Sequence, residues 1–218
     1  MRAGEAREMA EAQPIVFIID DDVSVREGIS DLLRSVGLGV QAFASAQEFM
    51  NSKRPQAPGC IILDLRLPGR SGLDFQQTLG KLDVRLPVIF ISGHGDIPIS
   101  VRAMKSGAIE FLTKPVNEQE LLDAVHTAIE RDRACRQRDA LVAELRARFE
   151  SLTSREREIM GLVVAGMLNK EIAFQTDLSV MTVKVHRSHV MRKMQAKSLV
   201  DLVRMADEVD VSGPKPKA

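Results

Sequence analysis

The stretch FIIDDDVSVREG, residues 17–28, decides the fold of the first half of the chain. It continues an apolar run, IVFII at residues 15–19, that ends in three consecutive aspartates, Asp20, Asp21 and Asp22. A short apolar run is typical of a buried strand, and the residues that follow have apolar side chains at helical spacing. Neighbouring carboxylates repel each other, so their place at the end of a buried strand suggests a binding site rather than a structural role.

Four further apolar runs follow within the first 115 residues, at 40–43, 60–63, 87–91 and 109–112. The runs at 15–19, 60–63 and 87–91 are apolar throughout, which indicates burial on both faces of a sheet. Segments with helical periodicity separate them, as in repeated βαβ units with a parallel sheet. The sequence therefore predicts a five-stranded, doubly wound α/β domain of the flavodoxin-like type over residues 14–130.

A long helix is predicted next, over residues 118–149, because this segment contains neither Pro nor Gly. Its middle, ERDRACRQRD, is almost entirely charged, as in a helix that bridges two domains through solvent. We interpret residues 131–150 as this linker. Its distal end has apolar residues at spacings of three and four, which fits a short coiled coil or a stripe that docks on the next domain: Val142, Leu145, Phe149 and Leu152.

Residues 151–208 contain helix signals and no strand signals. Thr153 and Glu156 form the pattern of a capping box at the start of the first helix. Three more short helices follow, with a tight turn between the second and the third. This arrangement predicts an all-α, four-helix domain of the helix-turn-helix type. Residues 1–13 and the tail at 209–218 are predicted to be disordered.

Composition limits the classes of protein that the chain can represent. Two cysteines, Cys60 and Cys135, in 218 residues give no disulfide framework, which favours a reduced cytoplasmic setting. The first residues lack the basic start and apolar stretch of a signal peptide, and no run is long enough to span a membrane. Residues 181–197 contain five Lys or Arg and no acid, which fits either a nucleic-acid surface or a solvated helix face.

Polar or charged residues follow four of the predicted strands. Asp20 and Asp21 come after the first strand, Asp64 after the third, Ser92 after the fourth, and Lys114 shortly after the fifth. The carboxyl ends of parallel strands meet at one edge of a sheet, where such folds bind their ligands. We therefore expect these side chains to form one site.

The chemistry of that site follows from its residue types. Three carboxylates repel by roughly 1 kcal/mol per pair in water and by ~4 kcal/mol at an effective dielectric constant near 20. A hard cation with oxygen ligands removes this cost, and Mg²⁺ suits such a site. A carboxylate can also attack phosphorus, and the incoming phosphoryl group would need a metal and a lysine beside it. The sequence thus predicts phosphoryl transfer to an aspartate.

The motifs FIIDDDVSVREG, LDLRLPGRSG, ISGHGD and FLTKP together resemble the receiver domain of two-component response regulators. The resemblance implies that Asp64 is the phosphoacceptor and that Asp20 and Asp21, with the backbone carbonyl of Arg66, bind Mg²⁺. It implies that Ser92 and Lys114 contact the phosphoryl group. Ser92 and Phe111 would be the switch residues, with Phe111 where the family often has Tyr.

A phosphatase of the haloacid dehalogenase type is an alternative, because such enzymes also use an aspartate nucleophile with Mg²⁺. They need a second aspartate two residues later as the general acid. Arg66 occupies that position in this chain. The sequence therefore argues against an enzyme and for a protein that accepts a phosphoryl group, with at most self-catalysed phosphorylation and dephosphorylation.

The motifs LTSRERE, NKEIA and TVKVHR resemble LuxR-type helix-turn-helix domains, which bind DNA. With the receiver, the chain resembles the FixJ/NarL class of response regulators. Asp177 stands in the turn where Gly or Asn is frequent, and Asp tolerates left-handed backbone better than most residues.

The third helix of this domain is the expected recognition helix. Val183, His186, Val190 and Met194 share one face, which we expect to be buried, and His186 is interpreted as a satisfied, semi-buried histidine rather than a zinc ligand. No acidic partner is apparent for His186 or His189. Lys184 and Val185 suit base edges, whereas the basic residues further along suit phosphates. The candidate DNA contacts are Thr182, Lys184, Val185, Arg187, Ser188, His189, Arg192 and Lys193.

The expected function is that of a DNA-binding transcriptional regulator, phosphorylated by a sensor histidine kinase. Phosphorylation is expected to favour a homodimer that binds promoter DNA and, with RNA polymerase, activates transcription. The main alternative is a regulator that binds DNA without phosphorylation and uses its receiver for docking or dimerisation.

Overall fold

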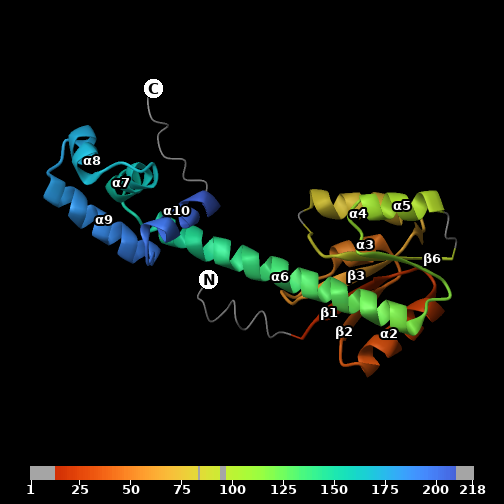
Figure 1. The fold of residues 1–218 in the computed structure, drawn as a ribbon. Helices are drawn as coiled ribbons and strands as arrows, with labels where there is room; N and C mark the ends of the chain where they lie inside the picture. The colour runs from red at the N-terminus through yellow and green to blue at the C-terminus, as the bar shows by residue number, and fades with distance from the viewer. Residues whose placement is uncertain (1–12, 83, 94–96, 210–218) are drawn as a thin grey trace. The chain divides into compact units, whose positions relative to one another are not determined.

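The computed structural model describes residues 13–82, 84–93 and 97–209 (Figure 1). The chain divides into two compact units between Gln137 and Arg138. The disorder predicted for the two ends of the chain falls almost entirely outside these ranges.

The first unit contains a five-stranded parallel sheet with the strand order β2-β1-β3-β6-β7. This topology confirms the predicted doubly wound α/β fold. Each predicted strand is present, with its bounds shifted by at most about one residue at an end. The strands are β1 (Ile15–Ile19), β2 (Gly39–Phe43), β3 (Gly59–Asp64), β6 (Val88–Ser92) and β7 (Glu110–Thr113).

Successive side chains of each strand point to opposite sides of this sheet, so both faces carry apolar side chains. Helices cover both faces. Val16 and Ile18 pack with α2 (Val23–Ser35) and the first half of α6 (Glu118–Glu150). On the opposite face, Phe17 and Ile19 pack with three other helices (Figure 1). These helices are α3 (Ala46–Asn51), α4 (Gly72–Lys81) and α5 (Ile97–Lys105).

The start of α2 explains the third aspartate of the opening motif. Asp22 is the N-cap residue, and its side chain accepts a hydrogen bond from the backbone N of Ser24 at 2.8 Å. Asp22 therefore serves the helix, as its position before Val23 predicts. One small element was not predicted: β4 (Arg66–Leu67) and β5 (Arg70–Ser71) form an antiparallel pair directly after Asp64.

The long helix α6 corrects the prediction that its middle is solvated on all sides. Asp132 is the one charged residue among the buried residues of this helix, which the structure describes throughout. Its Oδ2 accepts hydrogen bonds from the backbone N of Gly59 at 2.9 Å and from Nε of Arg136 at 2.6 Å. One carboxylate of the charged segment is therefore buried, because two fixed hydrogen-bond donors satisfy it.

The second unit contains the four predicted helices: α7 (Ser154–Val164), α8 (Asn169–Thr176), α9 (Val180–Met194) and α10 (Leu199–Glu208). The capping box of Thr153 and Glu156 is present at the start of α7. Asp177 ends α8 with a φ of 52°, in the left-handed region expected of it. The tight turn between α8 and α9 therefore keeps its geometry without glycine.

Apolar residues from all four helices share the core of this unit, which includes Ile159, Ile172, Val183 and Leu202. Leu145 and Phe149, near the end of α6, pack against this core, and Leu152 belongs to it. These contacts favour the docking interpretation of the distal stripe. Among the described residues, no helix combines the length and the apolar character needed to cross a bilayer.

Candidate functional site

Three carboxylates meet at the carboxyl edge of the sheet. Asp20 follows β1, Asp64 ends β3, and these strands are hydrogen-bonded neighbours. Asp20, Asp21 and Asp64 can each place an oxygen within 4.8 Å of the others. Hard oxygen donors so close together match the ligand preference of Mg²⁺. Asp20 and Asp64 are buried, whereas Asp21 is exposed, so the cluster is open to solvent on the Asp21 side.

Lys114 joins the two buried carboxylates. Its Nζ lies 2.6 Å from Oδ2 of Asp20 and 2.8 Å from Oδ2 of Asp64. The residue reaches this position because it follows β7, at the far edge of the sheet, and its backbone N donates to the carbonyl of Ser92 at 2.8 Å. Residues 94 positions apart in the sequence therefore form one ion-paired cluster.

Burial and charge oppose each other in this cluster. Burial raises the pKa of Asp20 above its ordinary value, although hydrogen bonds from Lys114 and Asp22 favour the charged form. Burial alone would lower the pKa of Lys114, but its hydrogen bonds and charge interactions with Asp20 and Asp64 outweigh burial and raise the pKa. Lys114 is therefore a stable cation, and Asp20 is a carboxylate that gains from further positive charge.

The backbone fixes the second oxygen of each buried carboxylate. Oδ1 of Asp20 accepts from the backbone N of Asp22 at 2.9 Å, and Oδ1 of Asp64 accepts from the backbone N of Arg66 at 3.0 Å. Arg26, which the sequence did not single out, donates from Nη1 to the carbonyl of Asp20 at 2.6 Å. Both carboxylates are thus oriented before any ligand binds.

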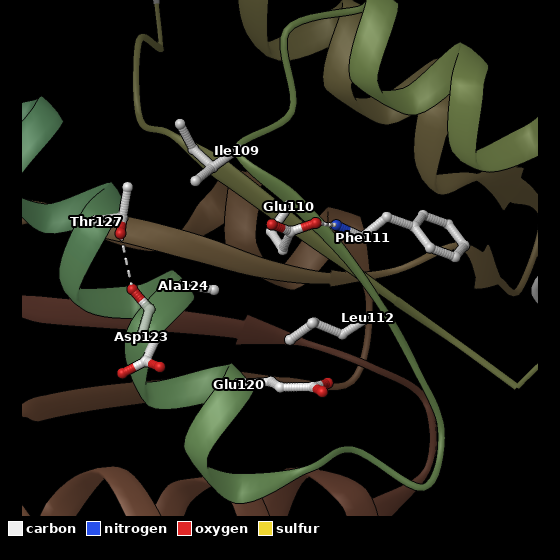
Figure 2. A pocket seen from close by; sticks show the side chains of 8 residues that line it. All are labelled: Ile109, Glu110, Phe111, Leu112, Glu120, Asp123, Ala124 and Thr127. Atoms are coloured by element: carbon white, nitrogen blue, oxygen red, sulfur yellow. Dashed lines mark hydrogen bonds between the residues drawn. The ribbon is translucent and has the colours of Figure 1, made fainter.

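The two predicted switch residues lie on β6 and β7. Ser92 is buried at the end of β6 and is paired in register with Thr113 of β7. Phe111 is partly buried against the core, beside a hollow of about 420 Å³ between β7 and α6. Figure 2 shows its ring pointing away from Glu120 and Asp123, which extend from α6. The hollow is acidic, with Glu110 also in its lining.

Gly72 is a site residue that sequence reasoning missed. It begins α4, and its backbone N donates to the carbonyl of Leu65 at 2.8 Å. A Cβ at this position would lie 2.5 Å from the backbone O of Asp64. Only glycine allows α4 to pack so closely against the loop that carries Asp64. The glycine in GRSG was the available signal, but contact with Asp64 depends on the tertiary fold.

The recognition helix α9 exposes a stripe of mixed character. Lys184, Val185 and Ser188, from the predicted set, are exposed on it, as is Arg192 further along. Met181 lies at helical spacing from Lys184 and Val185 and is 71% exposed. Met181 was missed because a methionine near the start of a helix reads as a core residue.

The other four predicted DNA contacts have partners within the protein. Oγ1 of Thr182 lies 2.8 Å from Oγ of Ser179, the N-cap residue of α9. Nη1 of Arg187 donates to Oδ1 of Asn169 at 2.8 Å, and Arg187 is partly buried rather than fully exposed. Lys193 and His189 both lie against Glu156 of α7.

Glu156 organises the junction of α7 and α9. Its Oε2 accepts from Nζ of Lys193 at 2.6 Å and from the backbone N of Thr153 at 2.8 Å. These interactions, the Lys193 hydrogen bond first, lower the pKa of Glu156 to about 2, against the effect of burial. Its Oε1 lies 3.6 Å from Nδ1 of His189. The expectation that His189 has no acidic partner is therefore wrong, because α7 supplies one.

His186 also departs from expectation in part. Val183, Val190 and Met194 form the predicted buried stripe, and His186 beside them is partly buried. Its Nδ1, however, is buried without a hydrogen-bond partner in the described part of the chain. The interpretation of His186 as a satisfied, semi-buried histidine is therefore confirmed for its partial burial and wrong at this atom.

Two families match the two units of the chain. Residues 16–126 match the response regulator receiver domain, and residues 150–206 match the bacterial regulatory proteins of the luxR family. Nodulation protein W of Bradyrhizobium diazoefficiens is 51% identical over 203 residues, which cover 93% of this chain and 89% of that protein. Response regulator protein TodT of Pseudomonas putida is 46% identical with the same coverage.

Solved structures agree with these sequence matches. The response regulator StyR, at 45% identity, gives a TM-score of 0.81 and covers 90% of this chain and 100% of its own. Full-length FixJ from B. japonicum, at 37% identity, gives a TM-score of 0.54 and covers 90% of this chain and 97% of its own.

The chain therefore belongs to the FixJ/NarL class of response regulators, in which a receiver domain precedes a LuxR-type DNA-binding domain. This confirms the resemblance seen in the sequence. The protein is a transcriptional regulator of the two-component type, and this class is not an enzyme in the usual sense.

Proposed function

We propose that Asp64 accepts a phosphoryl group from a sensor histidine kinase and that this modification controls the binding of the second unit to promoter DNA. The observation that carries the proposal is the bridge from Nζ of Lys114 to both Asp20 and Asp64, at 2.6 and 2.8 Å. A fixed cation beside a buried carboxylate suits the charge of an arriving phosphoryl group.

Different residues around Asp64 are assigned different roles in phosphoryl transfer. We assign the metal to Asp20, Asp21, Asp64 and the backbone carbonyl of Arg66. Bound Mg²⁺ would supply positive charge against the phosphoryl oxygens. An oxygen of Asp64 attacks phosphorus as the bond between phosphorus and the phosphohistidine nitrogen of the kinase breaks, and the kinase histidine leaves. Lys114, already held 2.8 Å from Asp64, can then pair with the transferred group.

Ser92 and Phe111 are proposed to report the phosphorylated state. The Ser92 hydroxyl, at the end of the strand beside β3, would bond a phosphoryl oxygen, and the partly buried Phe111 ring would change its packing on neighbouring β7. The two strands pair in register, which gives the change a short physical route. The same site would support self-catalysed phosphorylation from small donors and self-catalysed dephosphorylation.

The second unit supplies the output. We propose that phosphorylation favours a homodimer that binds two half-sites of a promoter and, with RNA polymerase, activates transcription. Relatives that bear the name transcriptional regulatory protein FixJ support this role. We keep residues 14–130 as the receiver, 131–150 as the linker and 151–208 as the DNA-binding domain. A regulator of promoters would act in the bacterial cytoplasm.

Labelling of the full chain with acetyl phosphate and Mg²⁺ tests the phosphorylation step. We expect D64N to remove the phosphorylated species from the intact-mass spectrum, because the nucleophilic carboxylate is lost. D74N is the matched control, since Asp74 is an exposed aspartate in the first turn of α4, ten residues after Asp64 in the sequence. Undiminished labelling of D64N would contradict the assignment.

Genome-wide DNA binding with and without the phosphodonor tests the output. We expect occupancy at promoters to rise with phosphorylation in the wild type and to stay at its basal level in D64N. Equal occupancy in both proteins under both conditions would favour the alternative, a regulator that binds DNA independently of phosphorylation.

A further inference from the structure

Arg187 is held differently from the neighbouring basic residues of α9. Its Nη1 donates to Oδ1 of Asn169 at 2.8 Å, and the side chain is partly buried. Lys184 and Arg192 on the same helix are exposed. Asn169 is the first residue of α8, so this hydrogen bond connects the two helices of the helix-turn-helix pair.

Asn169 is itself fixed by the start of α8. The preceding residue, Leu168, donates its backbone N to Oε2 of Glu171 at 2.7 Å, and its carbonyl accepts from the backbone N of Ile172 at 3.0 Å. Ile172 is fully buried in the core that it shares with Val183 of α9. The amide of Asn169 therefore projects from a rigid position rather than from a mobile loop.

We propose that Asn169 is a positioning residue for DNA binding, which holds the Arg187 guanidinium in the orientation that contacts a DNA phosphate. A guanidinium has five N–H donors in a planar fork, so the bond to Asn169 leaves the others for the ligand. A side chain that is already ordered loses less freedom on binding, a difference of about two- to tenfold in affinity. This inference rests on the proposed DNA-binding function.

A purely structural role for the same hydrogen bond makes a different prediction. If the bond only ties α8 to α9, its loss lowers the free energy of unfolding and leaves the DNA affinity of the folded protein unchanged. If Asn169 orients Arg187, its loss lowers the affinity, and it does so only while Arg187 is present. The interaction between the two substitutions separates the two roles.

The experiment is a double-mutant cycle in the full chain, with N169A, R187A and the combined variant. Affinity is measured for a duplex that the wild type selects from random DNA, and thermal unfolding is followed in parallel. We expect N169A alone to weaken binding about two- to tenfold and to have no further effect in the R187A background. R187A should lower the salt slope by about one, whereas N169A should leave it unchanged because the phosphate contact still forms.

Q175A is the matched control, because Gln175 is an exposed amide on the same helix. We expect it to bind like the wild type. Two outcomes would overturn this inference and leave the proposed function standing. One is that N169A lowers the affinity equally with and without Arg187, and the other is that N169A or R187A leaves the affinity unchanged. A wild-type chain that enriches no duplex would overturn the proposed function and this inference with it.

Discussion

Oδ2 of Asp132, on the long helix α6, accepts a hydrogen bond from the backbone N of Gly59 at 2.9 Å. Gly59 is the first residue of β3, and the last residue of that strand is Asp64. The carboxylate also accepts from Nε of Arg136 at 2.6 Å. The first half of the long helix is therefore bound to the strand that carries the proposed phosphoacceptor, and α6 belongs to the first compact unit as far as Gln137.

Removing this carboxylate should destabilise the first unit. D132A leaves a buried backbone N–H without an acceptor, so we expect the free energy of unfolding to fall by about 2–4 kcal/mol. Alanine is the best helix former, so any loss comes from the missing contacts. The control is E130A, which breaks the more exposed pair of Glu130 and Arg133 and should change stability by less than about 1 kcal/mol. Denaturant unfolding followed by circular dichroism measures both, and equal effects would contradict this account of Asp132.

Asp132 also marks the limit of what the sequence could predict. The strands, the parallel topology and the cap at Asp22 follow from local pattern, because apolar runs and capping residues act through near neighbours. The contacts of Asp132 with Gly59 and of Gly72 with Asp64 depend on how distant segments pack. Charge alone could not separate a DNA-facing lysine from one bound to Glu156, because α7 lies far from α9 in the sequence.

The aspartates of the opening motif should differ in their effects. We expect D21N to weaken Mg²⁺ affinity by about tenfold or more, since it removes a carboxylate from the cluster. D22N should keep both Mg²⁺ affinity and stability, because asparagine caps a helix as well as aspartate does. Titration of acetyl phosphate labelling against Mg²⁺ concentration tests the pair. Similar losses for the two variants would show that Asp22 is not confined to its capping role.

Gly72 and Gly80, both in α4, should respond to alanine in opposite directions. In G72A the new Cβ would lie 2.5 Å from the backbone O of Asp64, so we expect the free energy of unfolding to fall by about 1–3 kcal/mol and Asp64 to be labelled more slowly. In G80A nothing lies within 4 Å of the new Cβ, and the helix should gain up to about 1 kcal/mol. Thermal unfolding together with the labelling rate distinguishes them, and a G72A protein as stable as G80A would refute the packing argument.

Glu156 should make the second unit sensitive to acid. Its pKa is about 2 in the folded chain and 4.5 ordinarily, so its ionised form adds stability above pH 4.5 that is lost as the pH falls toward 2. The expected loss in the free energy of unfolding is about 1–3 kcal/mol, because solvent screens part of the interaction. E156Q should flatten this dependence, whereas E158Q, at an exposed pair with Arg155, should retain it. Denaturant unfolding of the second unit between pH 5 and pH 2 checks the prediction, and an unchanged slope in E156Q would contradict it.

Lys184 and Arg192 should contribute to DNA binding in different ways, although both are exposed on α9. Lys184 lies near the N-terminal end of the recognition helix. K184A should therefore lower the favourable binding free energy for the preferred base by about 1–3 kcal/mol at particular positions and relax specificity there. Arg192 lies in the last turn and should contact phosphate. R192A should therefore weaken binding to all DNA sequences alike and lower the salt dependence of the affinity by about one phosphate contact. Selection from random DNA, followed by affinity measurements at several salt concentrations, separates the two effects. If both variants lower the salt dependence equally and leave specificity intact, the N-terminal end of α9 does not read base edges.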